Sequence, residues 1–299
     1  MKNIFVALIA LSSAALAQET PGLGNSGLET LETREDLRGF EPVGRVDVKD
    51  GGFCTGALIA ADLVLTAGHC VVERNGNPVA ASRILFRAGL ANGEALVEVP
   101  VVRTIVDPAF RNLDPAPVEM IERDVALLQL AEPIPSALIS PFSVARPGNG
   151  DEVSVVSYAE GREDMLSWQR LCHVLGREGV LIAMDCDVTF GSSGAPVLDR
   201  SGYRAKIVSI ISAGSDEDGQ PIAIGMELPE QVDRLKAALR RGEATSVAEA
   251  PESAGVGTAS TGIGTASTGM PGKPAKRIVL QGDSGLASGS DGGARFVAP

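Results

Sequence analysis

The sequence predicts an all-β fold, and three observations lead to that expectation. From about Arg45 to Leu228 the chain alternates short apolar runs with turn residues, and most runs span about four to eight residues. The runs are rich in Val and Ile, and clusters of Gly, Pro, Asn or Asp separate them. Aromatic residues make up only 4% of the chain, so we expect a core of Val, Ile, Leu and Ala. This spacing is typical of a barrel or sandwich and not of alternating βαβ units.

The expected strands follow from the apolar runs in chain order. Most of these runs are too short for a typical helix, and turn residues bound them, which favours strands. They lie at residues 54–59, 63–68, 83–89, 95–106, 125–130, 152–158, 179–185, 195–199, 205–212 and 221–226.

One later stretch, residues 229–241, has a helical period instead. Its apolar residues recur three or four positions apart, as on the buried face of a helix. They are Val232, Leu235, Ala238 and Leu239. We expect this helix to pack against the last strand of the domain.

The first residues have the pattern of a secretory signal peptide. One Lys precedes an apolar run that closes with Ala15-Leu16-Ala17, a small-x-small cleavage pattern. The run is short for a membrane anchor, which is the alternative, and polar residues follow it at once. We therefore expect residues 1–17 to be removed and the protein to be secreted or periplasmic, without stable membrane insertion.

Two further segments flank the expected folded domain, which spans residues 44–242. Residues 18–43 are polar, contain Gly and Pro, and have no sustained period, so they are either an unstructured leader or a propeptide. Residues 243–299 are rich in Ala, Gly, Ser, Thr and Pro, and the unit GVGTASTG recurs as GIGTASTG. Such a composition buries too little apolar surface to fold, so we expect a disordered tail. Its basic-apolar stretch from Lys273 and the terminal ARFVAP are the parts that could dock on a partner.

Charge and cysteine content narrow the function classes. The formal net charge of −12 argues against nucleic acid or an acidic membrane surface as a partner, since both need clustered Lys and Arg. In an exported protein, four cysteines favour disulfides, and three connectivities are open. Closeness in sequence favours one bond between residues 54 and 70 and another between residues 172 and 186, because each pair flanks adjacent expected strands. The pairs are Cys54 with Cys70, and Cys172 with Cys186.

The spacing of the cysteines and histidines gives no support to a metal site. No CxxC pair exists, and His69 and Cys70 are sequence neighbours that could hardly converge on one ion. The acidic turn from Ser215, SDEDGQ, lacks the ligand spacing of a calcium loop, so a solvated turn is the simpler interpretation. We expect neither a metal nor a cofactor.

The chain contains only two histidines, so the candidates for a general base are few. His69 follows an apolar run in LVLTAGHC, where a small-residue turn leaves the imidazole at the edge of a strand. His173 lies beside a cysteine in LCHVLG, a further stretch that we expect to form a strand, where a satisfied or half-exposed side chain is the simpler interpretation. A serine nucleophile needs a neighbouring base to take its proton, and His69 is the candidate.

The candidate nucleophile is Ser193, which glycines frame in GSSGAP before an apolar strand. Glycines allow unusual backbone angles, so amide groups there can point at an oxyanion. The amides of Gly191 and Ser193 are the expected donors. An ordinary Gly- and Ser-rich hairpin turn is the alternative, and the upstream TAGHC sequence disfavours it.

Three motifs together resemble the chymotrypsin-like serine peptidases, in particular their bacterial trypsin-like and glutamyl-endopeptidase-like branches. They are TAGHC around His69, RDVALLQL around Asp124, and GSSGAP around Ser193, in the family's order of His, Asp and Ser. The resemblance implies two six-stranded antiparallel barrels with a C-terminal helix. It also implies a serine endopeptidase that cleaves protein or peptide substrates through an acyl-enzyme, with Asp124 orienting His69.

The same resemblance implies further roles. Cys54 and Cys70 match the bond that braces the loop of the histidine. Ser212-Ala213-Gly214 resembles the edge that binds the substrate backbone, so Ser212 and Gly214 are candidate binding residues. Asp187 stands six residues before the nucleophile, where it would either favour Arg or Lys at the cleavage site or serve a structural hydrogen bond.

The sequence departs from mammalian relatives at Ser192. Those members have an Asp there that pairs with a new N-terminus after zymogen cleavage. We therefore expect the oxyanion loop to form here without that salt bridge.

Two other function classes are open to such a sequence. One is a catalytically silent protease-like module that binds or scaffolds, which a complete set of reactive residues disfavours. The other is an adhesion or assembly protein whose tail carries the function.

Overall fold

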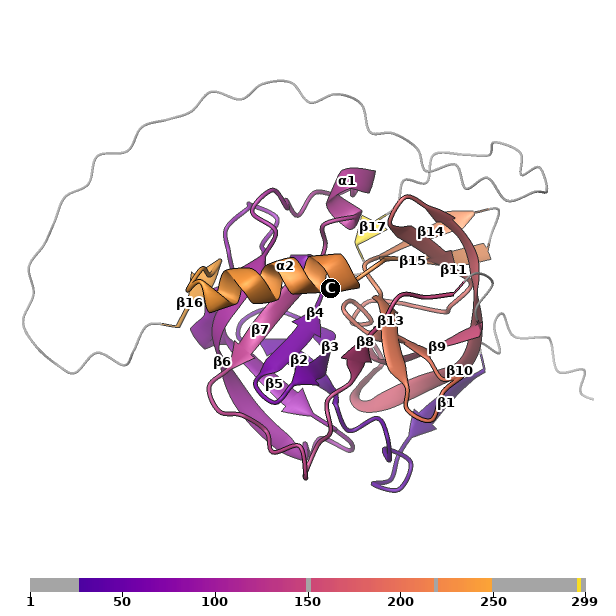
Figure 1. Cartoon of the computed structure of the whole chain (residues 1–299). Coiled ribbons are helices and arrows are strands. Elements are labelled where there is room, and N and C mark those ends of the chain that lie inside the picture. Colours follow the sequence, from indigo (N-terminus) through magenta and orange to yellow (C-terminus); the bar gives the residue numbers. More distant parts are fainter. Residues whose placement is uncertain (1–26, 149–151, 218–219, 249–294, 297–299) are drawn as a thin grey trace, which may run out of the picture.

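The computed structural model describes residues 27–148, 152–217, 220–248 and 295–296. The expected signal peptide at 1–17 and most of the expected tail lie outside these ranges. Two β-sheets lie side by side, the first from the earlier half of the chain and the second mainly from the later half (Figure 1). The all-β prediction is confirmed.

The first sheet closes into a six-stranded barrel. Its hydrogen-bonded order runs β6-β5-β2-β3-β4-β7, and β7 pairs again with β6, which leaves this barrel without open edges among those six strands. The strands are β2 (Val43–Val48), β3 (Phe53–Ala60), β4 (Leu63–Thr66), β5 (Ile84–Ala88), β6 (Val97–Val106) and β7 (Ala126–Leu130). The short helical segments are η1 (Gly68–Cys70), η2 (Ala81–Arg83) and α1 (Val118–Ile121).

The second sheet curls into the other barrel. Its order includes the run β14-β15-β11-β10-β9-β12-β13, and the first and last strands of this run, β14 and β13, are separated along the chain by only Ile211 and Ser212. They therefore act as one bent strand, so the expected two-barrel architecture is confirmed. The strands are β8 (Ser143–Val144), β9 (Glu152–Ala159), β10 (Arg162–Glu178), β11 (Leu181–Met184), β12 (Pro196–Asp199), β13 (Lys206–Ile210), β14 (Ala213–Glu217) and β15 (Gln220–Met226).

The segment before the first barrel is part of the packed structure. Strand β1 (Leu28–Leu31) pairs antiparallel with β10 of the second barrel. Leu37 and Phe40 are buried, and the ring of Phe40 lies 5.0 Å from that of Trp168. The packed unit thus begins upstream of residue 44, which argues against an unstructured leader for residues 27–43. Apolar side chains spaced without a clear period made this packing invisible in the sequence.

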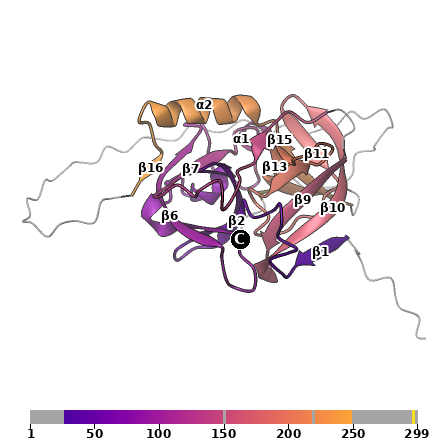
Figure 2. The same cartoon turned by 60° about the horizontal axis from the view of Figure 1, so that its bottom comes forward.

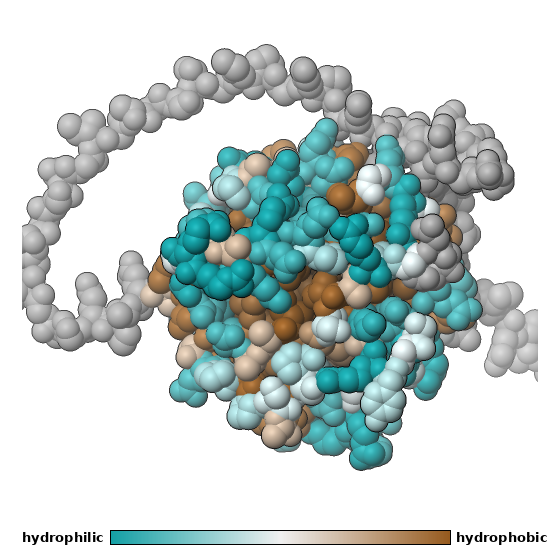
Figure 3. Space-filling view, viewed as in Figure 1, coloured by the Kyte–Doolittle hydropathy of each residue, from teal (hydrophilic) through white to brown (hydrophobic). Residues whose placement is uncertain are grey.

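The expected helix is present as α2 (Pro229–Arg240), and its predicted apolar face is buried. It lies along the outside of the first barrel, against β6 and β7, rather than mainly against the last strand (Figures 1 and 2). Its outward face is hydrophilic (Figure 3). The helix thus ties the end of the second barrel to the first.

Two parts of the expected disordered tail make backbone hydrogen bonds instead. Strand β16 (Ser246–Val247) pairs with β6, and β17 (Arg295–Phe296) pairs with β14. Strand β16 pairs with Arg103 and Thr104 of β6, which lie beyond the residues of β6 that pair with β5. Strand β17 pairs with β14, whose other partner is β15. Both therefore add to backbone groups that would otherwise lack a strand partner on one side. Within the described ranges, no helix is long and apolar enough to cross a membrane.

Both predicted disulfides are confirmed. Cys54 is bonded to Cys70, and Cys172 to Cys186, so no cysteine remains free. The first bond joins β3 to η1, and the second joins β10 to the segment after β11. The first bond therefore ties η1, which carries His69, to β3, and the second ties the segment that follows β11 to β10.

Candidate active site

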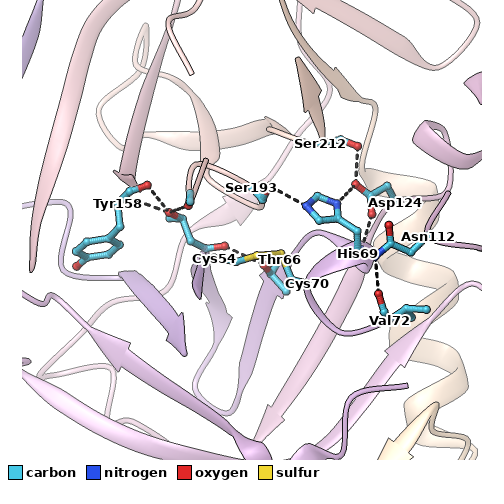
Figure 4. The surroundings of a disulfide bond; sticks show 12 residues. Cys54, Thr66, His69, Cys70, Val72, Asn112, Asp124, Tyr158, Ser193 and Ser212 are labelled. Carbon is cyan, nitrogen blue, oxygen red and sulfur yellow. Dashed lines mark hydrogen bonds and ion pairs between the residues drawn. A yellow bond between two sulfur atoms is a disulfide. The ribbon is translucent and has the colours of Figure 1, made fainter. Parts of the chain in front are cut away.

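The three residues proposed from the sequence motifs meet where the two barrels face each other. His69 lies on η1 directly after β4, Asp124 precedes β7, and Ser193 precedes β12. The Oγ of Ser193 lies 2.7 Å from Nε2 of His69, and Nδ1 of His69 lies 2.8 Å from Oδ2 of Asp124 (Figure 4). This hydrogen-bonded order is the one that proton transfer from serine to histidine requires.

Asp124 is held by three hydrogen bonds. Its Oδ1 accepts the backbone N–H of His69 at 2.8 Å, and its Oδ2 accepts both the ring N–H of His69 and the hydroxyl of Ser212 at 2.5 Å. The side chains of His69 and Asp124 are both 0% exposed. A carboxylate that is fully buried and bonded this way fixes the ring orientation and the tautomer in which Nδ1 carries the proton.

The loop before the nucleophile depends on glycine at two positions. Gly191 has φ +90°, and a Cβ there would lie 2.5 Å from the ring of Phe53 and 3.0 Å from Cα of Ala159. Gly194 has φ +75°, and a Cβ there would lie 2.4 Å from the carbonyl oxygen of Thr55. Side chains are therefore excluded by both backbone angle and space. Among the described residues, no acceptor is bonded to the amide of Gly191, as an oxyanion donor requires.

Thr55 of the first barrel anchors this loop. Its hydroxyl donates to the carbonyl oxygen of Gly191 at 3.0 Å and accepts the backbone N–H of Tyr158 at 3.0 Å. Its own backbone N–H donates to the carbonyl oxygen of Ser193 at 2.8 Å. The residue is fully buried. One threonine thus connects β3, β9 and the loop that carries both expected oxyanion donors.

The loop is also tied down at Ser192. The buried hydroxyl of Ser192 donates to that of Ser157 at 3.3 Å, and the N–H of Glu160 donates to the carbonyl oxygen of Phe190 at 2.8 Å. These contacts are neutral and come from β9 and its turn. In the described part of the chain these neutral hydrogen bonds hold the loop, and the expectation drawn from Ser192 stays a prediction.

Replacing Thr55 by Val is expected to lower the free energy of unfolding by about 1–3 kcal/mol, because the buried N–H of Tyr158 and carbonyl of Gly191 lose a partner. We also expect kcat for a peptide substrate to fall about 10-fold with KM nearly unchanged, since a loosened loop weakens transition-state contacts. Urea unfolding and steady-state kinetics measure the two effects. Thr55→Ser retains the hydroxyl and should recover most of kcat; equal losses in both variants would contradict the role given to the hydroxyl.

Asp187 is placed near a positive charge. Its backbone N–H donates to Oε1 of Gln169 at 2.8 Å. Burial lowers the pKa of the Arg162 guanidinium, and the carboxylate of Asp187 opposes that effect. Nη1 of Arg162 is buried and has no hydrogen-bond partner in the described part of the chain. The field of Asp187 is therefore partly offset by Arg162.

The remaining predicted residues take distinct places. Ser212 contacts Asp124, as described above, and Gly214 lies in β14, whose backbone pairs with β15 on one side. His173 is half exposed and pairs with Asp185, whereas the side chain of His69 is fully buried. This matches the simpler interpretation of His173.

One group of candidate metal ligands occurs among the described residues, formed by Cys54, His69 and Cys70. Both sulfur atoms are used in a disulfide, and the imidazole is hydrogen-bonded on both nitrogens. This donor set therefore does not suit a metal ion. The turn from Ser215 lies partly outside the described residues.

Sequence reasoning missed Thr55 and Arg162. Thr55 follows Cys54 in an apolar strand, where a small polar residue gives no sign of function, and its partner Gly191 is 136 positions away. A buried hydroxyl in a strand next to the histidine's disulfide was the only available signal. Arg162 follows a turn glycine and carries no motif at all.

Comparisons with known proteins agree with this geometry. A family model described as a trypsin-like peptidase domain matches residues 54–204, a range that includes His69, Asp124 and Ser193. Human serine protease 56 is 39% identical over 97 residues, which cover 31% of this chain and only 13% of that protein. The structure of a Glu endopeptidase superimposes with a TM-score of 0.59 and 18% identity, covering 70% of this chain and 96% of that one. At that identity the structural likeness shows a shared fold.

Proposed function

Because the chain belongs to the family of trypsin-like peptidase domains, we propose that it is an exported serine endopeptidase with His69, Asp124 and Ser193 as its catalytic triad. The observation that carries the proposal is the continuous buried hydrogen-bond chain from Ser193 Oγ through His69 to Asp124. A scaffold module would need neither these connected hydrogen bonds nor a loop built around glycines with positive φ. The binding-module alternative is therefore less well supported.

The proposed reaction begins with a peptide carbonyl next to Ser193. The Oγ of Ser193 attacks the carbonyl carbon while Nε2 of His69 takes its proton, and Asp124 stabilises the imidazolium that forms. The amides of Gly191 and Ser193 stabilise the oxyanion. His69 then gives the proton to the leaving amine, which leaves an acyl-enzyme on Ser193. Water enters, His69 takes its proton, and the same steps release the acid. No metal or cofactor takes part in these steps.

The proposed substrates are proteins or extended peptides. Ser212 and Gly214 border the strand edge where a peptide backbone would add to β14. If Asp187 alone set the cleavage preference, Arg or Lys would be strongly favoured. The nearby charge of Arg162 reduces that field, so we propose at most a weak preference for basic residues. We keep the sequence-based proposal of a secreted or periplasmic location, with which two disulfides are compatible.

The experiment that tests this function is labelling with a fluorophosphonate probe, which reacts with activated serines. We expect the purified protein lacking residues 1–17 to be labelled on Ser193, and Ser193→Ala to be unlabelled. Digestion of a peptide library by the same samples gives the cleavage preference. An unlabelled wild-type protein that retains its circular dichroism spectrum would favour the binding-module alternative.

The two histidines provide a matched comparison for the same assay. His69→Ala should lose labelling, because nothing then takes the proton of Ser193. His173→Ala should be labelled at the wild-type rate, since His173 is half exposed and pairs only with Asp185 among the described residues. Equal sensitivity of labelling to both substitutions would argue against His69 as the base.

A further inference from the structure

The strand edge beside the candidate active site is already paired with another part of this chain. Strand β14 has β15 on one side and β17 on the other. In the β17 pair, Ala213 lies opposite Phe296, and Gly214 lies opposite Arg295. Figure 1 shows β17 as the short yellow strand next to β14. These are the positions at which an extended peptide substrate was expected to bind.

The direction of β17 is that of a substrate. The pair is antiparallel, so the segment runs from its place opposite Gly214 to its place opposite Ala213, and thus towards Ser212. The hydroxyl of Ser212 is bonded to Asp124, which in turn contacts His69. A peptide in this register approaches the nucleophile with its carboxyl-terminal direction, as the residues before a scissile bond must.

A side-chain contact favours the same placement. Nε of Arg295 lies 4.0 Å from Oδ1 of Asp114, in the loop that precedes α1. The side chain of Arg295 is 77% exposed and that of Asp114 is 39% exposed and also pairs with Arg74, so this pair adds little binding energy but favours a basic residue at that position. The contact joins the segment to the first barrel as well as to β14 of the second.

The site is closed in the structure. Ser193 is 0% exposed, although a peptidase nucleophile must be reached by a peptide. The backbone edge that would receive that peptide is occupied by β17. An external substrate therefore needs β17 to leave before it can pair with β14.

We propose that the β14 edge binds the chain's own C-terminal segment, Arg295–Phe296, in the register of a substrate, so that the segment competes with external peptides. This inference rests on the proposed function, because it assigns an internal ligand to that active site. It also names a ligand class: extended peptides with Arg followed by Phe at the positions opposite Gly214 and Ala213.

The expected size of the effect follows from the tether. Residues 249–294 join the two described parts, so the segment and the β14 edge belong to one chain and their encounter is intramolecular. Such a tether gives an effective concentration on the order of 1 mM. For a short strand with a dissociation constant of roughly 0.1–1 mM, competition raises the apparent KM about 2- to 10-fold and leaves kcat unchanged.

The kinetic test compares the full chain with a variant that ends at Ala294. We expect the shortened variant to have a lower KM for a peptide substrate, by about 2- to 10-fold, with the same kcat. The double variant Arg295→Pro, Phe296→Pro keeps the length of the chain but removes two backbone donors, and should behave like the shortened one. Ala266→Pro, Ser267→Pro is the matched control elsewhere in the tail and should keep the KM of the full chain.

A binding test separates this inference from the proposed function. On the Ser193→Ala background, the fluorescent peptide Ala-Arg-Phe-Val-Ala-Pro is titrated by anisotropy into the full and the shortened chain. We expect tighter binding to the shortened chain, by the same factor as the change in KM. This result stands even if no variant cleaves peptides.

Three outcomes would overturn the inference. The first is an unchanged KM after removal of residues 295–299. The second is equal peptide affinity for the full and shortened Ser193→Ala proteins. The third is a KM that rises with enzyme concentration, which would assign the segment to the active site of another copy instead of its own.

Discussion

Asp124→Asn is expected to lower kcat for peptide cleavage about 10³- to 10⁴-fold with little change in KM. In the structure, the carboxylate accepts from the backbone N–H of His69, from its ring Nδ1–H and from Ser212. An amide has one acceptor oxygen and one donor nitrogen in place of two acceptors. If the oxygen stays with the backbone N–H, the NH₂ group faces Nδ1 and can only donate to it.

The consequence of that exchange is the wrong tautomer. His69 would carry its proton on Nε2, which faces Ser193 Oγ at 2.7 Å, and could no longer accept the proton of the nucleophile. The loss should therefore appear in kcat and in the rate of fluorophosphonate labelling, while peptide binding persists. Steady-state kinetics and labelling time courses measure both.

A second aspartate in this chain supplies the control. Asp185 contacts His173 in the same way, with the backbone N–H on Oδ1 at 2.5 Å and the ring on Oδ2 at 3.0 Å, but on the surface. Asp185→Asn should leave kcat within about twofold of wild type, because surface pairs contribute little. A kcat loss of similar size in both variants would show that the effect of Asp124→Asn is structural and not catalytic.

Gly191→Ala is expected to lower kcat/KM about 10²- to 10³-fold, the effect of losing one oxyanion donor. The φ of +90° is costly for alanine, and the added Cβ would lie 2.5 Å from the ring of Phe53 and 3.0 Å from a backbone atom of β9. The ring can move, but the Cα of Ala159 cannot do so without shifting β9. The loop must therefore shift, and the amide of Gly191 with it.

Kinetics with a peptide substrate and binding of a peptide aldehyde, which forms a tetrahedral adduct, measure this effect. We expect aldehyde affinity to fall in parallel with kcat/KM. Gly202→Ala is the control, since Gly202 lies in a surface turn and its added Cβ would meet nothing closer than 3.8 Å. Wild-type aldehyde affinity in Gly191→Ala would remove Gly191 from the proposed oxyanion donors.

Much of the fold could be predicted because it depends on local patterns. The apolar runs between turn residues placed most of the barrel strands, and the helical period at 229–241 placed α2 and its buried face. The disulfides followed because each pair is close in sequence, 16 and 14 residues apart. Such features depend on neighbours along the chain, which a sequence displays directly.

The candidate nucleophile, base and acid were also accessible from the sequence. Each lies in a short motif whose residues are contiguous, and glycines with positive φ mark the turn around Ser193. The structure then brings these three side chains within hydrogen-bond distance, although 124 positions separate His69 from Ser193.

By itself, the sequence determined the all-β class, the cysteine pairs and the identity of the three reactive candidates. Only the tertiary structure decided what supports and occupies the site. The hydroxyl of Thr55 donates to the loop that carries the expected oxyanion donors, and the hydroxyl of Ser212 donates to Asp124. Arg162 interacts electrostatically with Asp187, and β17 pairs with β14. The physical reason is that these contacts join side chains and strand edges from distant parts of the chain. The local sequence around a threonine, an arginine or a two-residue strand is the same whether or not folding brings a distant partner to it.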